Sequence, residues 1–208
     1  MTALKQRSGS ASQKVTVIEL GCANTASVLF ALERLGVEAR LTSDAAEIAA
    51  AEKVVLPGVG AAGFVMSRIH NLGLFETIRN IKVPLLGVCL GQQLLFDGST
   101  EGDVQCLGLI PGQVTKMVVT KDLVVPHMGW NQLEITRDDP LTNGVEDGDF
   151  AYFVHSYVCP VNDFTLATST YGQPFAAMVR KDNVWGCQFH PERSSTAGVV
   201  ILKNFLSL

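Results

Sequence analysis

A cysteine flanked by two glycines is the residue of this 208-residue sequence best suited to nucleophilic chemistry. The segment 87–91, Gly-Val-Cys-Leu-Gly, follows an apolar run typical of a buried strand and precedes a pattern typical of a helix. A sharp turn from strand to helix pushes its central side chain out at the sheet edge, and glycines let neighbouring backbone pass closely. The positive potential at the helix N-terminus favours a thiolate. We interpret Cys89 as the nucleophile of a strand–turn–helix elbow.

The residues after Cys89 can serve the same chemistry. The backbone N–H of Leu90 is placed to hold a developing oxyanion. Gln93 follows Cys89 by one helical turn on the same face, so its amide can reach an atom bound at the sulfur. Taken alone, the elbow also fits a buried cysteine whose glycines relieve crowding, and Gln93 also fits a solvated helix position.

A thiol nucleophile needs a general base, and the base needs a group that fixes its tautomer. Of the four histidines, His190 ends an apolar strand pattern in the segment 188–192, Gln-Phe-His-Pro-Glu. In an extended segment residues i and i+2 project to the same side, so Glu192 can accept from one ring nitrogen while the other faces the thiol. Taken alone, this segment also fits a strand end followed by an exposed turn. Because Cys89 and His190 both end predicted strands, we predict that they meet with Glu192 as a triad.

The elements that must position these residues alternate between short β-branched runs and helical patterns. Strands are predicted at 15–20, 37–41, 53–56 and 83–88, and helices at 24–35, 44–51 and, after a glycine-rich loop at 57–63, through about 80. Such alternation implies parallel strands with helical crossovers. From residue 112 the pattern changes to short strands, some of them antiparallel, at 112–119, 132–136, 151–154, 164–170, 175–180 and 184–189, before a helix at 195–206. We predict an α/β fold with an open, mostly parallel sheet, helices on both faces and antiparallel additions.

Composition excludes several classes of function. The net charge is −4, and no window clusters Lys and Arg, which argues against nucleic acid as a partner. No apolar run approaches the roughly 20 residues of a membrane span, and residues 1–14 lack the apolar stretch of a secretory signal. We therefore expect a cytoplasmic protein with a flexible extension at 1–14 and one domain at 15–208. The five cysteines include no C-x-x-C pair, and the histidines lack ligand spacing, so we expect reduced thiols, no metal and no cofactor.

The sequence from residue 15 to 208 resembles the class I, triad-type glutamine amidotransferases. The segments 87–93 and 188–192 match that family in the expected order. The resemblance implies a thioester-forming nucleophile, a proton carrier and an orienting carboxylate in Cys89, His190 and Glu192. It also implies that the substrate glutamine is held by Gln93 and by the backbone near Ser156 and Tyr157.

The segment 57–60, Pro-Gly-Val-Gly, resembles the oxyanion strand of the same family. The resemblance implies that the backbone N–H groups of Val59 and Gly60 face the thioester carbonyl together with that of Leu90. Because glycines flank Val59, its peptide can flip. We expect an inactive resting form that a partner corrects.

Two further segments, 126–131 (Pro-His-Met-Gly-Trp-Asn) and 152–157 (Tyr-Phe-Val-His-Ser-Tyr), are similar to stretches of the glutaminase subunits of imidazole glycerol phosphate synthases. The resemblance implies a heterodimer in which ammonia passes to a barrel-shaped cyclase subunit for histidine biosynthesis. It places at or near the interface Asn24, Met128, Trp130 and Tyr152. Taken alone, residues 126–131 fit a turn with a buried tryptophan.

The sequence departs from that family's pattern in three places. Glu19 and Leu20 stand where Asp-Tyr is common, near the end of the first predicted strand, and this difference has no functional explanation. Arg193 stands where many members have Lys, so a planar guanidinium replaces a point-like ammonium at the interface. Gln92 stands where Met is usual, which puts the packing behind the nucleophile in doubt.

Two other functions stay open from the residues. The same triad can serve an enzyme that makes anthranilate, carbamoyl phosphate, guanylate or pyridoxal phosphate, although Trp130 and its neighbours argue against this. A binding module with an inactive elbow is the second, and it has no use for the intact set of Cys89, Gln93, His190 and Glu192.

Overall fold

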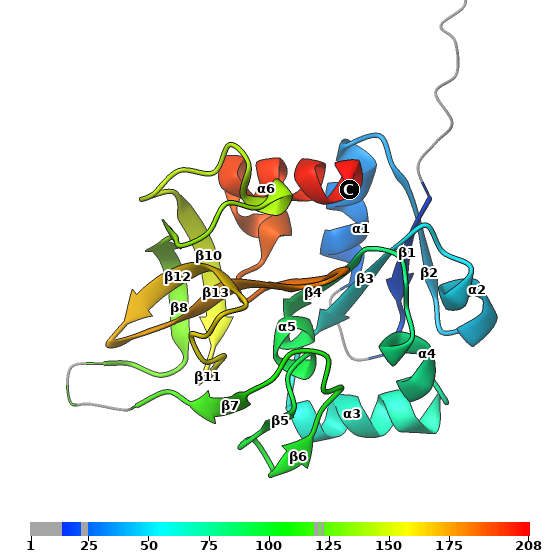
Figure 1. Cartoon of the computed structure of the whole chain (residues 1–208), viewed down its shortest axis with the longest axis horizontal. Coiled ribbons are helices and arrows are strands. Elements are labelled where there is room, and N and C mark those ends of the chain that lie inside the picture. Colours follow the sequence, from blue (N-terminus) through cyan, green and yellow to red (C-terminus); the bar gives the residue numbers. More distant parts are fainter. Residues whose placement is uncertain (1–13, 22–24, 119–120, 122) are drawn as a thin grey trace, which may run out of the picture.

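The structure is a computed structural model that describes residues 14–21, 25–118, 121 and 123–208. Its main sheet has eight strands in the order β2-β1-β3-β4-β14-β13-β12-β9 (Figure 1). These strands are β1 (Lys14–Ile18), β2 (Glu38–Thr42), β3 (Lys53–Gly58), β4 (Leu85–Cys89), β9 (Glu134–Ile135), β12 (Thr165–Tyr171), β13 (Gln173–Lys181) and β14 (Val184–Cys187). The first five strands in that order are parallel, and the last three pair antiparallel. The predicted sheet is therefore confirmed.

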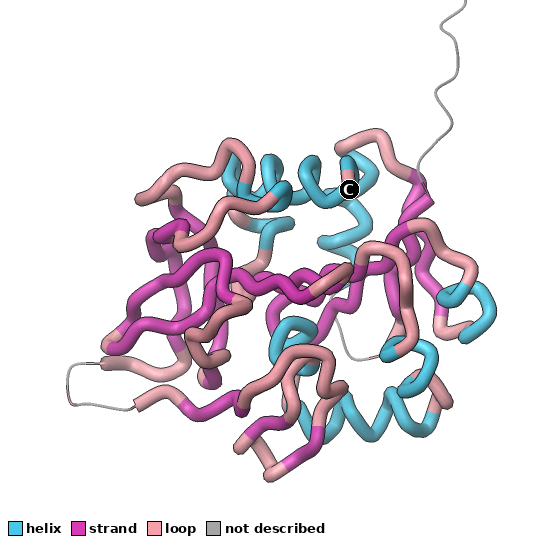
Figure 2. Tube along the Cα trace, in the orientation of Figure 1, coloured by secondary structure: helices cyan, strands magenta, loops and turns pink. Residues whose placement is uncertain are grey.

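Helices cover both faces of this sheet (Figure 2). One face packs against α1 (Thr25–Arg34) and α6 (Ser195–Ser207). The other face packs against α2 (Ala45–Ala49), α3 (Ala62–Asn71), α4 (Phe75–Arg79) and α5 (Leu90–Leu94). The central strand β4 is buried along its whole length, as expected for a parallel strand between two helical layers.

Two small sheets lie beside the main one. Strand β8 (His127–Gln132) pairs antiparallel with β10 (Phe150–His155). The other sheet has the order β11-β7-β5-β6 and comprises β11 (Tyr157–Val158), β7 (Gln113–Lys116), β5 (Gly98–Ser99) and β6 (Val104–Gln105). Short 3₁₀ turns are η1 (Pro140–Thr142) and η2 (Pro191–Arg193).

The alternative for residues 126–131, a turn with a buried tryptophan, is wrong: residues 127–132 form strand β8, and Trp130 is 51% exposed. Two expected boundaries also differ. The expected strand at 132–136 shrinks to β9 because Gln132 belongs to β8. The helical stretch through residue 80 is interrupted at Gly73, whose φ of +67° ends α3 before α4 begins.

Some expectations fall partly or wholly outside the described residues. The predicted extension at 1–14 lies outside them except for Lys14, which is the first residue of β1. Asn24 also lies outside.

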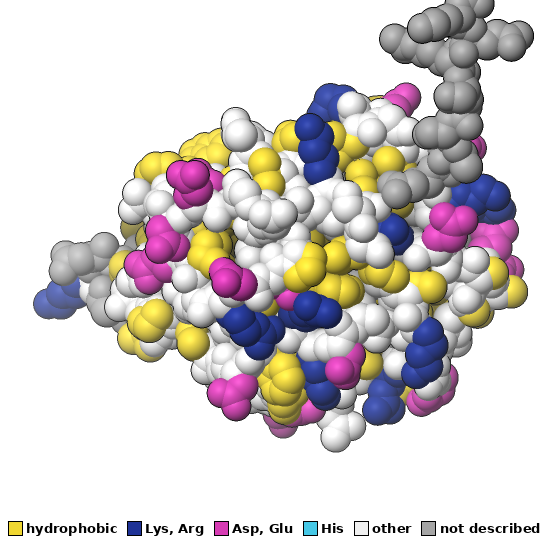
Figure 3. All heavy atoms as spheres, turned by 45° about the horizontal axis from the view of Figure 1, so that its top comes forward, with side chains coloured by type: hydrophobic (Ala, Val, Ile, Leu, Met, Phe, Trp, Pro, Cys, Tyr) yellow, Lys and Arg dark blue, Asp and Glu magenta, His cyan; other side chains and the backbone are white. Residues whose placement is uncertain are grey.

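No helix in the described part of the chain combines the length and the apolar character that a bilayer span requires. Acidic and basic side chains are interspersed on the face over α1 and α6 (Figure 3).

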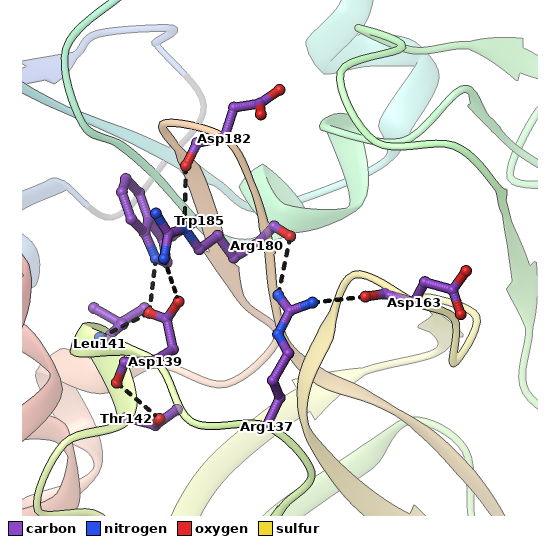
Figure 4. Close-up of polar contacts among 8 residues, drawn as sticks. All are labelled: Arg137, Asp139, Leu141, Thr142, Asp163, Arg180, Asp182 and Trp185. Atoms are coloured by element: carbon purple, nitrogen blue, oxygen red, sulfur yellow. Dashed lines mark hydrogen bonds and ion pairs between the residues drawn. The ribbon is translucent and has the colours of Figure 1, made fainter.

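A buried carboxylate anchors the start of β14 (Figure 4). Asp139 accepts from the Trp185 indole at 3.0 Å, from the Leu141 backbone N–H at 2.8 Å and from the Arg180 guanidinium at 2.7 Å. Arg180 and Trp185 are register partners, and the guanidinium lies 4.6 Å from the indole ring centre. The cluster fastens η1 to the hairpin of β13 and β14. It thereby fixes the strand whose other end leads to His190.

Candidate active site

Cys89 lies at a sharp strand-to-helix turn. It ends β4, α5 begins at the next residue, and its φ of +55° is strained for a residue with a side chain. A Cβ at Gly87 would lie 2.7 Å from the Gly91 carbonyl oxygen, and a Cβ at Gly91 would collide with the Leu56 carbonyl. Both glycines are therefore required by close backbone approach.

His190 lies between the Cys89 thiol and the Glu192 carboxylate. Its Nδ1 atom is 2.9 Å from Glu192 Oε1, and its ring lines the same cavity as the Cys89 side chain. The backbone geometry differs from the expected extended segment, because Pro191 starts the 3₁₀ turn η2. The structure thus brings the two side chains together by a turn rather than by strand alternation.

The electrostatics of this group favour a protonated imidazole. Burial alone would lower the pKa of His190, but its hydrogen bonds to Cys89 and Glu192 and the charges of the same two groups raise that pKa to about 10. The protonated ring is a proton donor beside the sulfur of Cys89. The arrangement can therefore hold a nucleophile and a proton donor side by side.

The fully buried Ser194 holds the backbone of His190. Its hydroxyl donates to the His190 carbonyl at 2.7 Å and accepts from the Tyr152 N–H at 3.0 Å. The His190 N–H in turn donates to the Tyr152 carbonyl at 2.9 Å. Sequence reasoning missed Ser194, because a serine before a helix is normally a cap and this one makes no cap bond.

A cavity of about 260 Å³ opens beside Cys89. Eight predicted site residues line it: Val59, Gly60, Cys89, Leu90, Gln93, Ser156, Tyr157 and His190. Four further residues, none of them predicted as a site residue, complete the wall: Glu101, Pro126, Val154 and His155. Glu192 is not among the lining residues and reaches the site through His190.

Gln93 is buried in the cavity wall rather than solvated. Its amide donates to the Tyr157 carbonyl at 3.1 Å and to Gln188 Oε1 at 3.0 Å. These bonds tie α5 to β11 and to the segment before His190. Gly60, also in the wall, has a φ of +97°, which a residue with a side chain rarely adopts.

Among the described residues that line this cavity, Glu101 is the one with an acidic side chain. Its Oε2 atom accepts from the backbone N–H of Ala62 at 2.8 Å, at the start of α3. No motif surrounds Glu101 in the sequence, and its contact spans 39 residues, so only the fold could reveal it.

Apart from Asn24, which lies outside the described residues, the predicted partner-facing residues lie on the β8–β10 ribbon and on η2. Met128 and Trp130 are 63% and 51% exposed, and the Trp130 ring lies 5.8 Å from that of its register partner Tyr152. Phe150, which was not predicted, adds another exposed ring to β10. Arg193 is exposed and lines a second cavity of about 180 Å³ that is also bounded by His190.

Gln92 is accommodated by its neighbours. It is fully buried, and its amide donates to the Ala176 carbonyl at 3.0 Å. A Cβ at Gly186 would lie 2.7 Å from Gln92 Cγ, so the glycine makes room for this side chain. Within the described residues Gln92 Oε1 has no hydrogen-bond partner.

The other described cysteines are buried thiols. Burial raises the pKa of Cys106 to about 11 and that of Cys159 to about 12, and it also raises the pKa of Cys187 well above its usual value. In residues 14–21, 25–118, 121 and 123–208, no cluster of His, Cys, Asp or Glu is arranged to hold a metal ion.

Known proteins share both the sequence and the fold. The family model "Glutamine amidotransferase class-I" matches residues 16–208. The chain is 52% identical over 194 residues to the imidazole glycerol phosphate synthase subunit HisH of Xanthomonas axonopodis pv. citri, covering 93% of this chain and 97% of that protein. It is 46% identical over 203 residues to the subunit of the same name from Vibrio cholerae, covering 95% and 100%.

Solved structures agree on the fold. A putative GMP synthase subunit from Thermoplasma acidophilum superposes with a TM-score of 0.72 at 19% identity, covering 96% of this chain and 94% of that one. PurLQS from Thermotoga maritima gives 0.70 at 20% identity, covering 95% and 99%. These identities are low enough that the likeness speaks for the fold alone. The family model and the two close relatives confirm the resemblance, and the chain belongs to the class I glutamine amidotransferases, within the group of imidazole glycerol phosphate synthase subunits HisH.

Proposed function

We propose that this chain hydrolyses glutamine to glutamate and ammonia through a thioester on Cys89 and delivers the ammonia to the cyclase subunit of imidazole glycerol phosphate synthase. The observation that carries the proposal is the position of His190, which contacts both Cys89 and the Glu192 carboxylate at the edge of a cavity. Residues 15–208 act as one amidotransferase domain. We place the reaction in the cytoplasm.

The chemistry is acyl transfer. The Cys89 thiolate attacks the side-chain carbonyl carbon of glutamine, and the oxyanion is held by the N–H of Leu90 and by the Val59–Gly60 loop. The C–N bond breaks as His190 donates its proton to the departing nitrogen, which leaves as ammonia. Water then attacks the thioester while His190 accepts a proton, and glutamate leaves with Cys89 restored.

Two sets of groups hold the substrate. Gln93 and the backbone of Ser156 and Tyr157 form one set, Glu101 is the other, and all of them line the cavity. A carboxylate is complementary to the α-ammonium group of glutamine, so Glu101 binds that group.

The exposed apolar side chains of the β8–β10 ribbon support the choice of partner. Exposed Met128, Trp130 and Phe150 form an apolar surface with Tyr152 beside the site, as expected for a protein interface. Arg193 extends this surface next to the second cavity. We place the cyclase subunit on it, so that ammonia leaves the site without meeting bulk water. The glycines around Val59 permit the peptide rearrangement by which the partner activates the site.

Glutamate release by the purified chain tests the proposal, measured alone and with the cyclase partner and its nucleotide substrate. Strong activation by the partner, lost in Cys89→Ala, is the expected result. Equal rates with and without the partner would contradict the assignment to this synthase. Full activity in Cys89→Ala would contradict the thioester.

A further inference from the structure

Two buried histidines, one in the cavity wall and one bonded to it, have no part in the acyl transfer. His127 and His155 are register partners on β8 and β10, and both are almost fully buried. The Nδ1 atom of His127 is 3.0 Å from Nε2 of His155. His155 lines the cavity, whereas His127 does not.

The direction of this hydrogen bond follows from the partner of the other ring nitrogen of His155. His155 Nδ1 lies 2.8 Å from the Tyr157 carbonyl oxygen. A carbonyl only accepts, so Nδ1 of His155 carries the proton and Nε2 of the neutral ring has a free lone pair. His127 must then donate its own Nδ1 proton to His155.

Both rings are neutral at physiological pH. Burial lowers the pKa of His127 to about 4. For His155, burial is only partly offset by the hydrogen bond to Tyr157, and the neighbouring His127 and His190 lower the pKa further, to about 4. A neutral imidazole has one donor and one acceptor, so each of the two rings donates through Nδ1 and accepts at Nε2.

Asn131 lies beside the other ring nitrogen of His127, Nε2. Its Oδ1 atom accepts from the Gln132 N–H at 2.8 Å, and its Nδ2 atom donates to the Thr170 carbonyl at 2.9 Å. The same Nδ2 atom lies 3.5 Å from Nε2 of His127. The orientation of the amide is therefore determined by the backbone, and it presents a donor to the unprotonated nitrogen of His127.

Aromatic packing holds the two rings in place. The His127 ring stacks on Tyr171 at 4.1 Å and on Phe153 at 5.1 Å. The His155 ring meets Phe175 edge-on at 4.9 Å. A ring flip would need this packing to open, so the hydrogen bonds and the packing select the same arrangement.

The chain of bonds ends on the cavity wall. The Tyr157 carbonyl accepts from His155 and also from Gln93 Nε2 at 3.1 Å. Without a donor at its Nε2 side, the buried Nε2 lone pair of His155 loses its partner, and the ring is no longer held from the side of His127. The ring can then turn away from the Tyr157 carbonyl, which would lose one of its two donors.

We propose that His127 is a positioning residue for glutamine binding, which acts by donating to His155 and so keeping the His155 Nδ1 proton on the Tyr157 carbonyl. The inference rests on the proposed function, since Tyr157 and Gln93 are there assigned to the glutamine cavity. It predicts an effect on substrate affinity rather than on the chemical step.

Two variants of His127 separate positioning from packing. His127→Phe keeps an aromatic ring against Tyr171 but removes the donor, whereas His127→Asn keeps an N–H close to the position of Nδ1. With the full chain and its cyclase partner, His127→Phe should raise KM for glutamine about tenfold, with kcat within about twofold of the parent. His127→Asn should recover most of that loss. A KM equal to the parent value in His127→Phe, or a fall in kcat alone, would overturn the proposal.

A measurement on the unmodified chain keeps the inference testable even if a variant fails to fold. Nitrogen-15 NMR of the imidazoles should show His127 and His155 both protonated at Nδ1 and unprotonated at Nε2 at neutral pH. A proton on Nε2 of either ring would overturn the proposal. An unmodified chain without glutaminase activity in the presence of its partner would instead refute the proposed function, whatever the tautomers.

Discussion

The backbone N–H of His190 donates to the carbonyl of Tyr152 at 2.9 Å. Strand β10, which carries Phe150 and Tyr152 of the apolar surface, is therefore hydrogen-bonded directly to the proposed base. The same strand reaches the nucleophile, since the Val154 carbonyl lies 3.7 Å from the Cys89 sulfur. A partner that shifts β10 would move both reacting groups, which ties the docking surface to the chemistry.

Ser194→Ala should lower kcat about tenfold with little change in KM, because it removes two buried hydrogen bonds that hold the His190 backbone. Initial rates of glutamate release give both constants. Ser207→Ala, at an exposed position at the end of α6, serves as the matched control and should behave as the parent. Unchanged kcat in Ser194→Ala would show that the bonds to Ser194 do not position the base.

Glu101→Gln should raise KM for glutamine by about 10- to 100-fold, because the neutral amide still accepts from Ala62 but no longer attracts the α-ammonium group. Glutaramate, which is glutamine without that ammonium, provides the internal comparison. The variant and the parent should handle glutaramate alike. The exposed Glu76→Gln is the control for a loss of charge elsewhere. If glutamine and glutaramate lose affinity equally, Glu101 has only a structural role.

The buried histidine pair should make the fold sensitive to acid. Burial lowers the pKa values of His127 and His155 to about 4, below the value of about 6.5 in the unfolded chain. The unfolded state then binds more protons between these values, so stability is full above about pH 6.5 and falls as pH drops through about 4. Urea unfolding from pH 7 to pH 4 should show a shallower decline in His127→Phe than in the parent. Parallel declines would mean that the pair is not buried as neutral rings.

How much of this molecule was predictable depends on the range of the contacts. The elbow at Cys89 and the parallel sheet were predictable, because glycine spacing and strand–helix alternation are local patterns. The strand β8 was not, since Pro126 and Gly129 resemble turn signals although Gly129 lies within an antiparallel pair.

The roles of Ser194 and Glu101 were out of reach for a different reason. Each depends on one backbone group about 40 residues away, Tyr152 N–H at a separation of 42 and Ala62 N–H at 39. The contact between His190 and Glu192 was expected, but from an extended segment rather than from the 3₁₀ turn that the structure has. The sequence could not distinguish the two, because residues i and i+2 can meet in either conformation.

Asp139→Asn should lower the free energy of unfolding by about 1–3 kcal/mol while leaving kcat and KM unchanged. The amide still accepts from Trp185 and Leu141 but no longer carries the charge that pairs with Arg180. The cluster adjoins the start of β14, and that end of the strand pairs with the start of β4, away from Cys89. Chemical denaturation and steady-state rates test the two parts of this prediction.

Asp182→Asn is the matched control, because Asp182 is exposed and contributes only its backbone carbonyl to this cluster. It should change stability by no more than about 0.5 kcal/mol. Loss of activity in folded Asp139→Asn would mean that this cluster is coupled to the site after all.

The thioester itself can be trapped. Rapid acid quench of the complex turning over glutamine, followed by peptide mass spectrometry, should find a glutamyl adduct on the peptide that contains Cys89. The peptides of the buried Cys106, Cys159 and Cys187 should carry none. Cys89→Ala should form no adduct and release no glutamate. Sustained glutamate release by Cys89→Ala would contradict covalent catalysis at Cys89.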